Sequence, residues 1–112
     1  MTRPRKLRWV QGRPVVTAFL PNQMPPWGRQ EVILPVEGLE AIRLADYVGL
    51  DQETAAGMMN VSRQTFGRIL AEARVVVADA LIMGKVLQIE VGRFEMPPRG
   101  RGGHRRGWRG GF

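Results

Sequence analysis

Hydrophobic residues recur with a helical period through the middle of the chain. Between residues 36 and 83 they are spaced three and four positions apart, which is typical of amphipathic helices. Asp51 and Ser62 are good N-cap residues, and Gly49 and Gly84 are natural helix ends. The pattern therefore predicts three helices, of which the third, from Ser62 to Gly84, is the longest.

Short segments with strand character flank the helical region. Val15–Leu20 is rich in β-branched residues and predicts a strand, whereas Glu31–Leu34 is either a second strand or an extended entry into the first helix. Val86–Val91 alternates like an edge strand and is expected to pair with Val15–Phe19. The expected fold class is mainly α, a three-helix domain with minor short strands near both ends.

Charge divides the chain of 112 residues, with its net charge of +7, into a body and two basic ends. Residues 1–14 carry five cations and no acid, and residues 93–112 carry six cations and one acid. Residues 15–92 carry six cations and nine acids. We predict a basic N-terminal arm at 1–14, a body at 15–92 with its helical core at 36–83, and a disordered Gly/Arg-rich tail at 93–112. Basic ends suit a polyanion, because neutralised phosphates release counterions.

The composition offers little material for catalysis. The chain has no cysteine, and its only histidine, His104, lies in the Gly/Arg-rich tail. We find no nucleophile–base pair, metal cluster or phosphate-binding loop in the sequence, so we expect no enzyme activity, metal or cofactor. The apolar run Val75–Met83 is interrupted by Asp79 and is shorter than the roughly 20 residues of a membrane helix. No apolar segment follows the basic N-terminus as in a signal peptide, so we expect a cytoplasmic protein without membrane contact.

Residues 52–70 (QETAAGMMNVSRQTFGRIL) match the requirements of a helix-turn-helix. The first helix needs a small residue at the crossing, and the turn needs a residue that tolerates a left-handed backbone, followed by an apolar one. The second helix needs inward apolar residues spaced three apart. The residues that meet these structural demands are Ala56, Asn60, Val61, Phe66 and Ile69.

The start of the second helix of this motif is polar and suits contact with DNA bases. Arginine bonds guanine through two hydrogen bonds, glutamine does the same for adenine, and hydroxyls reach phosphates or base edges. The predicted major-groove contacts are Ser62, Arg63, Gln64, Thr65 and Arg68. The predicted contacts from the arms to the DNA backbone are Arg3, Arg5, Lys6, Arg8, Arg105 and Arg106. The hypothesis requires that Arg63, Gln64 and Arg68 project from the body.

Three phrases in the chain resemble one bacterial and archaeal family. They are TRPRK near the start, LEAIRLAD at Leu39–Asp46 and VSRQTFGRILAEAR at Val61–Arg74, and the resemblance to Uncharacterised Protein Family 0251, or domain of unknown function 134, covers roughly residues 2–92. It implies a DNA-binding transcription regulator with a helix-turn-helix similar to region 4 of sigma factors. The first helix departs from the usual pattern by opening with Pro35-Val36-Glu37-Gly38, so its first turn is expected to fray, and the tail lies beyond the resemblance.

Two other functions remain open. Trp108 lies among the arginines of the tail, and such a segment stacks on unpaired bases, so the alternative is RNA or single-stranded DNA binding led by the tail. The other alternative is a protein-interaction module that docks on the transcription machinery, such as RNA polymerase, without recognising bases.

The second half of the third helix is apolar on most sides, and a helix of this kind is buried on most sides. We favour burial within one chain by the N-terminal strand and Val86–Val91. The alternative is a homodimer interface, which would place two recognition helices on half-sites about 34 Å apart. Trp9 and Trp27 are expected to be buried, and Arg43 and Asp46 to make solvated surface contacts.

Overall fold

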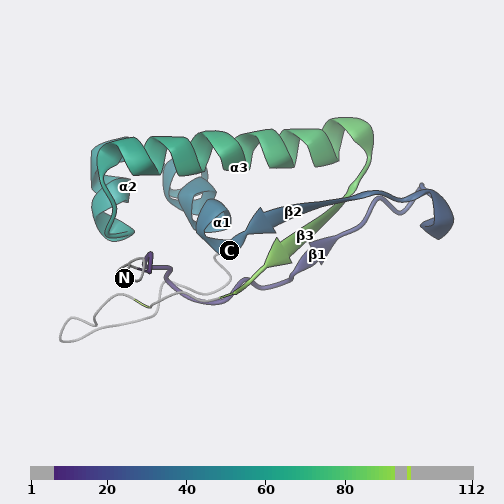
Figure 1. Cartoon of the computed structure of the whole chain (residues 1–112), viewed down its shortest axis with the longest axis horizontal. Coiled ribbons are helices and arrows are strands. Elements are labelled where there is room, and N and C mark those ends of the chain that lie inside the picture. Colours follow the sequence, from purple (N-terminus) through teal and green to yellow (C-terminus); the bar gives the residue numbers. More distant parts are fainter. Residues whose placement is uncertain (1–6, 93–95, 97–112) are drawn as a thin grey trace, which may run out of the picture.

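The computed structural model describes residues 7–92 and residue 96. In this part of the chain three α-helices lie against a small sheet (Figure 1). The helices are α1 (Val36–Ile42), α2 (Gln52–Met58) and α3 (Arg63–Met83), and the strands are β1 (Ala18–Phe19), β2 (Glu31–Pro35) and β3 (Val86–Glu90). The mainly α fold with a long third helix is confirmed, while the predicted tail, apart from residue 96, falls outside the described residues.

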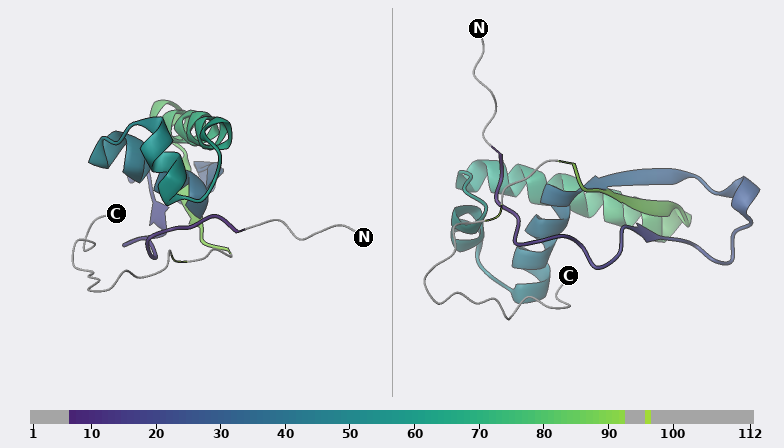
Figure 2. Two further views of the ribbon diagram at one scale, coloured as in Figure 1. Left: turned by 90° about the vertical axis from the view of Figure 1, so that its left-hand side faces the viewer. Right: turned by 90° about the horizontal axis from the view of Figure 1, so that it is seen from below.

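The elements are arranged around α3, which lies along the long axis of the molecule (Figure 1). Figure 2 shows α1 and α2 beside the N-terminal half of α3, and the loop between β1 and β2 beyond its C-terminal end. Contacts follow the same division, since α2 packs on α3 while β2 and β3 cover the later turns of the helix. One end of the molecule is therefore helical, and the other is built on the sheet.

The sheet has the order β1-β3-β2, so β3 is its central strand. The expected antiparallel pairing with β1 is present, with Ala18 opposite Gln88. However, β3 also pairs in parallel with β2, from Glu31 opposite Val86 onward, so the prediction of an edge strand was wrong. Val86 and Ile89 are both buried although their side chains lie on opposite faces of the sheet. β1 is shorter than the predicted strand.

The first helix changes its geometry partway along. α1 ends at Ile42 and continues as a π-helix from Arg43 to Val48, which the helical period did not predict. The backbone N–H groups of Gly49 and Leu50 both donate to the carbonyl of Leu44, at 3.1 and 2.9 Å. Gly49 has φ 88°, so it ends the helix in the left-handed conformation, as expected.

The start of α1 is packed rather than frayed. Val36 and Gly38 are buried, and a Cβ atom on Gly38 would lie 3.0 Å from Leu34 Cδ1 and 3.1 Å from Ala73 Cβ. The absence of a side chain at this position therefore lets α1 approach α3 and β2 closely. The expected fraying was wrong because tertiary packing holds a turn that has no side-chain cap.

Apolar side chains at the sheet end are more exposed than expected. Ala80 is buried and Val76 is half-buried, but Leu81 and Ile82 are 76% and 79% exposed. Burial within one chain therefore covers only one side of the second half of α3. Trp27 is 87% exposed in a single 3-10 turn, so its expected burial was also wrong.

Candidate nucleic-acid interface

A short turn joins α2 to α3 and fixes how the two helices meet. Asn60 has φ 59° and is the only residue other than glycine with positive φ in the described part of the chain. Its left-handed backbone is the one expected from the sequence. The N–H of Val61 donates to the carbonyl of Ala56 at 3.1 Å, which ties the turn back to α2.

The structural positions of the motif form the core beneath this turn. Ala56, Phe66 and Ile69 are 2%, 0% and 4% exposed, and the half-buried Val61 packs against the same cluster. Ala56 lies in the packed core that α2 shares with α3, so a longer side chain there would have to displace its neighbours. Each of the five predicted structural residues therefore lies where the motif requires it.

Side-chain caps hold the start of both helices. Asp51 Oδ1 accepts a hydrogen bond from the N–H of Thr54 at 2.7 Å, and Ser62 Oγ accepts one from the N–H of Thr65 at 3.1 Å. The bond from Thr54 lowers the pKa of Asp51 below its usual value of 3.8, with a smaller effect from the cation Arg63. Ser62 also donates to Thr65 Oγ1 at 3.0 Å, so both hydroxyls already serve the cap.

The three remaining contact residues project from the surface. Arg63, Gln64 and Arg68 are all exposed, while Thr65 is half-buried. Arg68 Nη1 lies 3.8 Å from Glu72 in an ion pair that is solvent-exposed on both sides, and such a pair is weak. The surface therefore presents two guanidiniums and one carboxamide at the start of α3.

One neighbouring side chain was not predicted from the sequence. The first residue of α2, Gln52, places its Oε1 within 3.3 Å of the position that a Cβ on Gly67 would take. Gly67 therefore makes room for Gln52, which is exposed and borders the same surface. A glutamine near a helix start is only a weak sequence signal for this contact, because Gln52 comes near α3 only through the crossing of the two helices.

Residues 8–11 of the predicted arm are attached to the body. Val10 is fully buried, and the N–H of Trp9 donates to the carbonyl of Met59 at 3.1 Å, one residue before the turn. The body therefore begins before residue 15, and Trp9 lies beside the turn of the helix-turn-helix. The apolar pair Trp9-Val10, set among polar residues, was the sequence signal for this attachment.

The predicted role of Arg8 in binding the DNA backbone is not supported by its position. Its Nε lies 3.2 Å from Glu37 Oε1 in an ion pair that does not meet hydrogen-bond geometry, and its side chain is only 14% exposed. A guanidinium held in this way has little surface left for a phosphate. The other arm residues in this prediction (Arg3, Arg5, Lys6, Arg105 and Arg106) lie outside the described residues.

A buried carboxylate on α1, that of Glu40, holds the same segment through the backbone of Gln11. Glu40 is 1% exposed and accepts two hydrogen bonds from Arg43, at 2.8 and 2.9 Å, and one from the N–H of Gln11 at 3.3 Å. The expected solvated surface role of Arg43 was therefore wrong, because its guanidinium satisfies a carboxylate inside the protein. Asp46 does lie on the surface, where Arg74 holds it at 2.6 Å and lowers its pKa.

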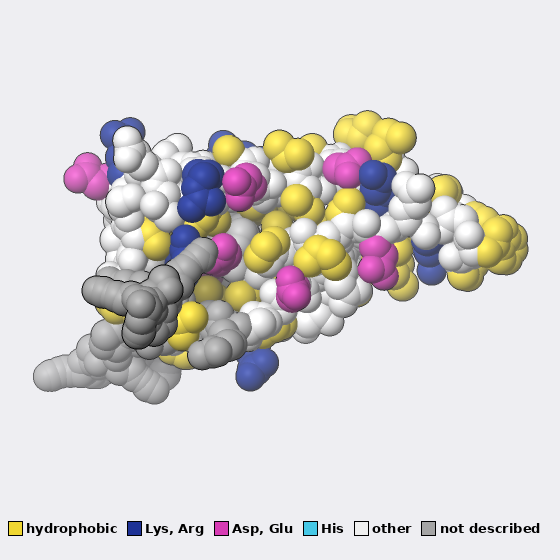
Figure 3. Space-filling view, viewed as in Figure 1, with side chains coloured by type: hydrophobic (Ala, Val, Ile, Leu, Met, Phe, Trp, Pro, Cys, Tyr) yellow, Lys and Arg dark blue, Asp and Glu magenta, His cyan; other side chains and the backbone are white. Residues whose placement is uncertain are grey.

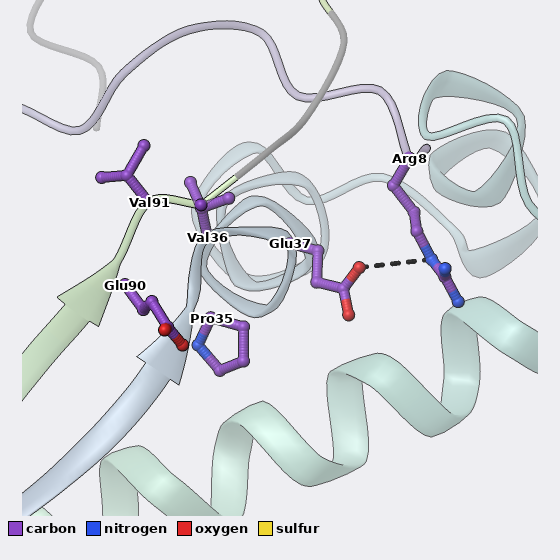
Figure 4. Close-up of a pocket in the computed structure, with 7 residues that line it drawn as sticks. Arg8, Pro35, Val36, Glu37, Glu90 and Val91 are labelled. Carbon is purple, nitrogen blue, oxygen red and sulfur yellow. Dashed lines mark ion pairs between the residues drawn. The ribbon is translucent and has the colours of Figure 1, made fainter. Parts of the chain in front are cut away.

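A hollow of about 130 Å³ lies where the ends of β2 and β3 meet the start of α1 (Figure 4). In Figure 4 Arg8 and Glu37 point toward one another at one side, and Glu90 and Val91 lie at the other. Small-molecule pockets generally measure about 300–1,000 Å³, so this hollow is too small for a nucleotide-sized ligand. Among the residues that the structure describes, no group of three or more potential metal ligands is found, and no helix is both long and apolar enough to cross a membrane.

Charge is unevenly distributed between the described body and the rest of the chain. The described residues hold eight of the 17 Lys and Arg side chains and nine of the ten acids. The whole excess of positive charge therefore resides in residues 1–6, 93–95 and 97–112. Any strong attraction to a polyanion would therefore have to come from these segments.

Comparison with known proteins places the chain among sequences of unassigned function. The family model described as "Protein of unknown function DUF134" matches residues 1–97. UPF0251 protein TTE1845 of Caldanaerobacter subterraneus subsp. tengcongensis is 51% identical over 96% of both chains. UPF0251 protein Teth514_1147 of Thermoanaerobacter sp. is 51% identical over 94% of this chain and 93% of its own, and UPF0251 protein CT0950 of Chlorobaculum tepidum is 50% identical over 81% and 60%. No solved structure matches the chain.

Proposed function

This chain belongs to the DUF134 family, and we propose that it binds double-stranded DNA in a sequence-specific manner, as a transcription regulator. In this proposal the first turns of α3 enter the major groove. The observation that carries the proposal is the exposure of Arg63, Gln64 and Arg68 at the capped start of a helix held by a left-handed turn. Had these side chains packed against the interior, the hypothesis would have failed.

The chemistry of these three residues supports base recognition. Arg63 and Gln64 lie in the first turn of α3, and their side chains form no hydrogen bond or ion pair within the described residues. Arg68 has only its weak contact with Glu72. Guanidinium and carboxamide groups form paired hydrogen bonds with guanine and adenine. Because Ser62 and Thr65 are used in the cap, we assign them to positioning the helix and to phosphate contact.

The basic ends supply the sequence-independent part of binding. The tie between Trp9 and Met59 sets the start of the described chain beside the turn, so Arg3, Arg5 and Lys6 begin within a few residues of the interface. An extended chain spans about 3.3 Å per residue, which gives these cations access to phosphates or the minor groove next to the major-groove contact. Arg105 and Arg106 add to the same attraction from the other terminus.

Selection from random duplexes at a stated salt concentration tests the proposal. Arg63→Ala and Gln64→Ala are each expected to reduce the preference for the selected duplex over a scrambled one by about 1–3 kcal/mol. Gln23→Ala, an exposed glutamine in the loop at the sheet end, is the matched control and should leave the preference unchanged. Arg5→Ala should instead weaken both duplexes equally and flatten the salt dependence. Equal losses on both duplexes with Arg63→Ala would reject base recognition by this residue.

The charge distribution also favours a second candidate function, binding of RNA or single-stranded DNA by the tail. A full-length variant with Arg105, Arg106 and Trp108 replaced by alanine separates the two. Under the leading proposal, this variant loses affinity for all duplexes but keeps its sequence preference. Under the second, binding to a single strand collapses and no duplex preference exists to be kept. If the selection yields no preferred duplex and no single strand binds, docking on the transcription machinery, including RNA polymerase, becomes the favoured function.

A further inference from the structure

We propose that the outer side of α3 binds a second copy of this chain, with the two helices parallel. Four exposed residues make up this surface, here called the outer stripe: Ala71, Val75, Ala78 and Ile82. Val75 and Ile82 are 67% and 79% exposed, and the stripe contains no charged residue. In Figure 3 hydrophobic side chains lie along the upper edge, where α3 runs, and gather at its C-terminal end.

The spacing of the outer stripe is that of a two-stranded coiled coil. Its residues are four, three and four positions apart, so they keep to one side of the helix when it winds around a partner. β-branched residues alternate with alanines, and the alanines allow two backbones to approach closely. The opposite side of α3 is already occupied, since Ala73 and Ala80 are buried within the chain.

The charges beside the outer stripe identify the partner and its direction. In a heptad with Val75 at position a, Glu72 and Asp79 occupy the e positions on one side, and Arg74 occupies a g position on the other. In a parallel pair each g residue faces the e residue five positions later in the partner. Arg74 would then face Asp79 of the second copy, and symmetry repeats the contact. An antiparallel pair would instead bring the acids at Glu72 and Asp79 of both copies together.

These charges have partners within the chain that do not block the contact. Arg74 bonds Asp46 through Nε and Nη2, and Lys85 Nζ lies 2.9 Å from Asp79 Oδ2. The side chains of Arg74 and Asp79 are still 54% and 35% exposed. A guanidinium has five N–H groups and a carboxylate has about four acceptor sites, so each retains capacity for an intermolecular bond.

The outer stripe ends where Arg68 takes the next a position. In a parallel pair the two Arg68 guanidiniums would face and repel each other there, so the helices diverge toward their N-termini. Both starts of α3 then lie at the same end of the dimer. The stripe covers 12 residues, a length of about 18 Å, so we expect association in the micromolar range. If the proposed DNA binding holds, the DNA sequence that the dimer recognises is an inverted repeat whose two half-sites adjoin, and not two half-sites that lie one helical turn apart.

Sedimentation equilibrium of the full chain without DNA tests self-association. The double variant Val75→Gln, Ile82→Gln should raise the dimer dissociation constant at least about tenfold, because it places polar groups at the centre of the contact. The control is Val15→Gln, Val16→Gln, which changes two valines that are 65% and 46% exposed away from the outer stripe. Circular dichroism confirms that each variant is folded. A wild-type chain that stays monomeric at millimolar concentration, or equal losses in the two double variants, would overturn the proposal.

A charge exchange tests the parallel direction. Arg74→Glu places two acids opposite each other in a homodimer, and Asp79→Lys places two cations opposite each other, so each variant alone should dimerise more weakly. An equimolar mixture restores opposite charges at both contacts and should recover the wild-type dissociation constant within about threefold. Failure of the mixture to recover would exclude the parallel pairing.

The two proposals fail in different experiments. Self-association is measured without DNA, whereas base recognition is measured by the preference lost in Arg63→Ala. The parallel dimer on DNA would be supported if the wild-type chain selects duplexes with adjoining inverted half-sites. The Val75→Gln, Ile82→Gln variant should then select duplexes without this symmetry. Single half-sites selected by a chain that dimerises would refute that arrangement and leave the dimer intact.

Discussion

The two halves of α3 follow the same inward pattern but differ on their outward side. The first half buries Phe66 and Leu70 against α2 and exposes polar residues such as Gln64. The second half buries Ala73 against the sheet and exposes apolar residues such as Val75. Burial explains the inward residues of both halves equally. The outward residues are free of that constraint, and their difference underlies the two contacts we propose, with a nucleic acid at one end and a second copy of the chain at the other.

The largest expected effect is on the free energy of unfolding, when substitutions on the inward and outward sides of α3 are compared. Phe66→Ala removes a fully buried ring from beneath the turn and should lower the free energy of unfolding by about 3–5 kcal/mol. Val75→Ala shortens a side chain that is 67% exposed and should change the free energy of unfolding of the monomer by less than about 0.5 kcal/mol. Urea unfolding at low protein concentration measures both. Similar losses would mean that the two sides of α3 do not differ in burial.

A pair of glycines compares a crowded helix position with an open one. Gly38→Leu forces atoms into the contact of α1 with Leu34 and Ala73 and should cost about 1–3 kcal/mol of stability. A Cβ atom on Gly57 in α2 would meet nothing within 4 Å, so Gly57→Leu should stabilise by about 0.5–1 kcal/mol through helix propensity. Thermal unfolding distinguishes them by the sign of the change in Tm. A stabilising Gly38→Leu would contradict the close approach of α1 to α3.

The cap of α3 allows stability and DNA affinity to be separated. Ser62→Ala removes the acceptor for the N–H of Thr65 and should destabilise the protein by about 1 kcal/mol. Ser62→Asp keeps a capping oxygen and should leave stability nearly unchanged, while its negative charge at the proposed interface weakens duplex binding. Paired measurements of Tm and duplex affinity test this expectation. Loss of stability in Ser62→Asp equal to that in Ser62→Ala would contradict the assigned role of the hydroxyl.

The smallest expected effect is a dependence of stability on acidic pH. The pKa of Asp51 is lowered by the N–H of Thr54, and the pKa of Asp46 is lowered by its hydrogen bonds with Arg74. Because the folded-state values lie below the unfolded ones, this stabilisation is present above the usual value of 3.8 and is lost as pH falls through the folded values. Tm should therefore decline in this range, and less so in Asp51→Asn, which still caps the helix. An identical pH profile for Asp51→Asn would exclude the contribution of Asp51.

Features that depend on neighbouring residues could be predicted from the sequence. The caps at Asp51 and Ser62, the left-handed turn at Asn60 and the helix end at Gly84 all follow from local backbone preferences. The inward positions of α3 followed from its period. These local features also place the candidate interface, so most of its outline was available without coordinates.

Features that depend on distant residues could not be predicted in this way. The alternation of Val86–Val91 suits an edge strand, and only its pairing with β2, more than 50 residues earlier, makes it central. Arginine usually lies on the surface, yet Arg43 bonds the buried Glu40, which also accepts a hydrogen bond from the docked N-terminal segment. The role of Arg8 was predicted from charge alone, but the partner that neutralises it, Glu37, lies on α1.

The central position of β3 has a consequence for the order in which the molecule forms during synthesis. Contacts between α2 and α3 join residues close in sequence and form early, whereas β2 must wait until residues 86–90 have left the ribosome. During that interval Leu34 and Ala73 have not yet met Ile89, and an unpaired strand and an uncovered helix face are exposed together. Translation that stops before residue 86 would therefore release a nascent chain with a formed α2–α3 end and an aggregation-prone remainder.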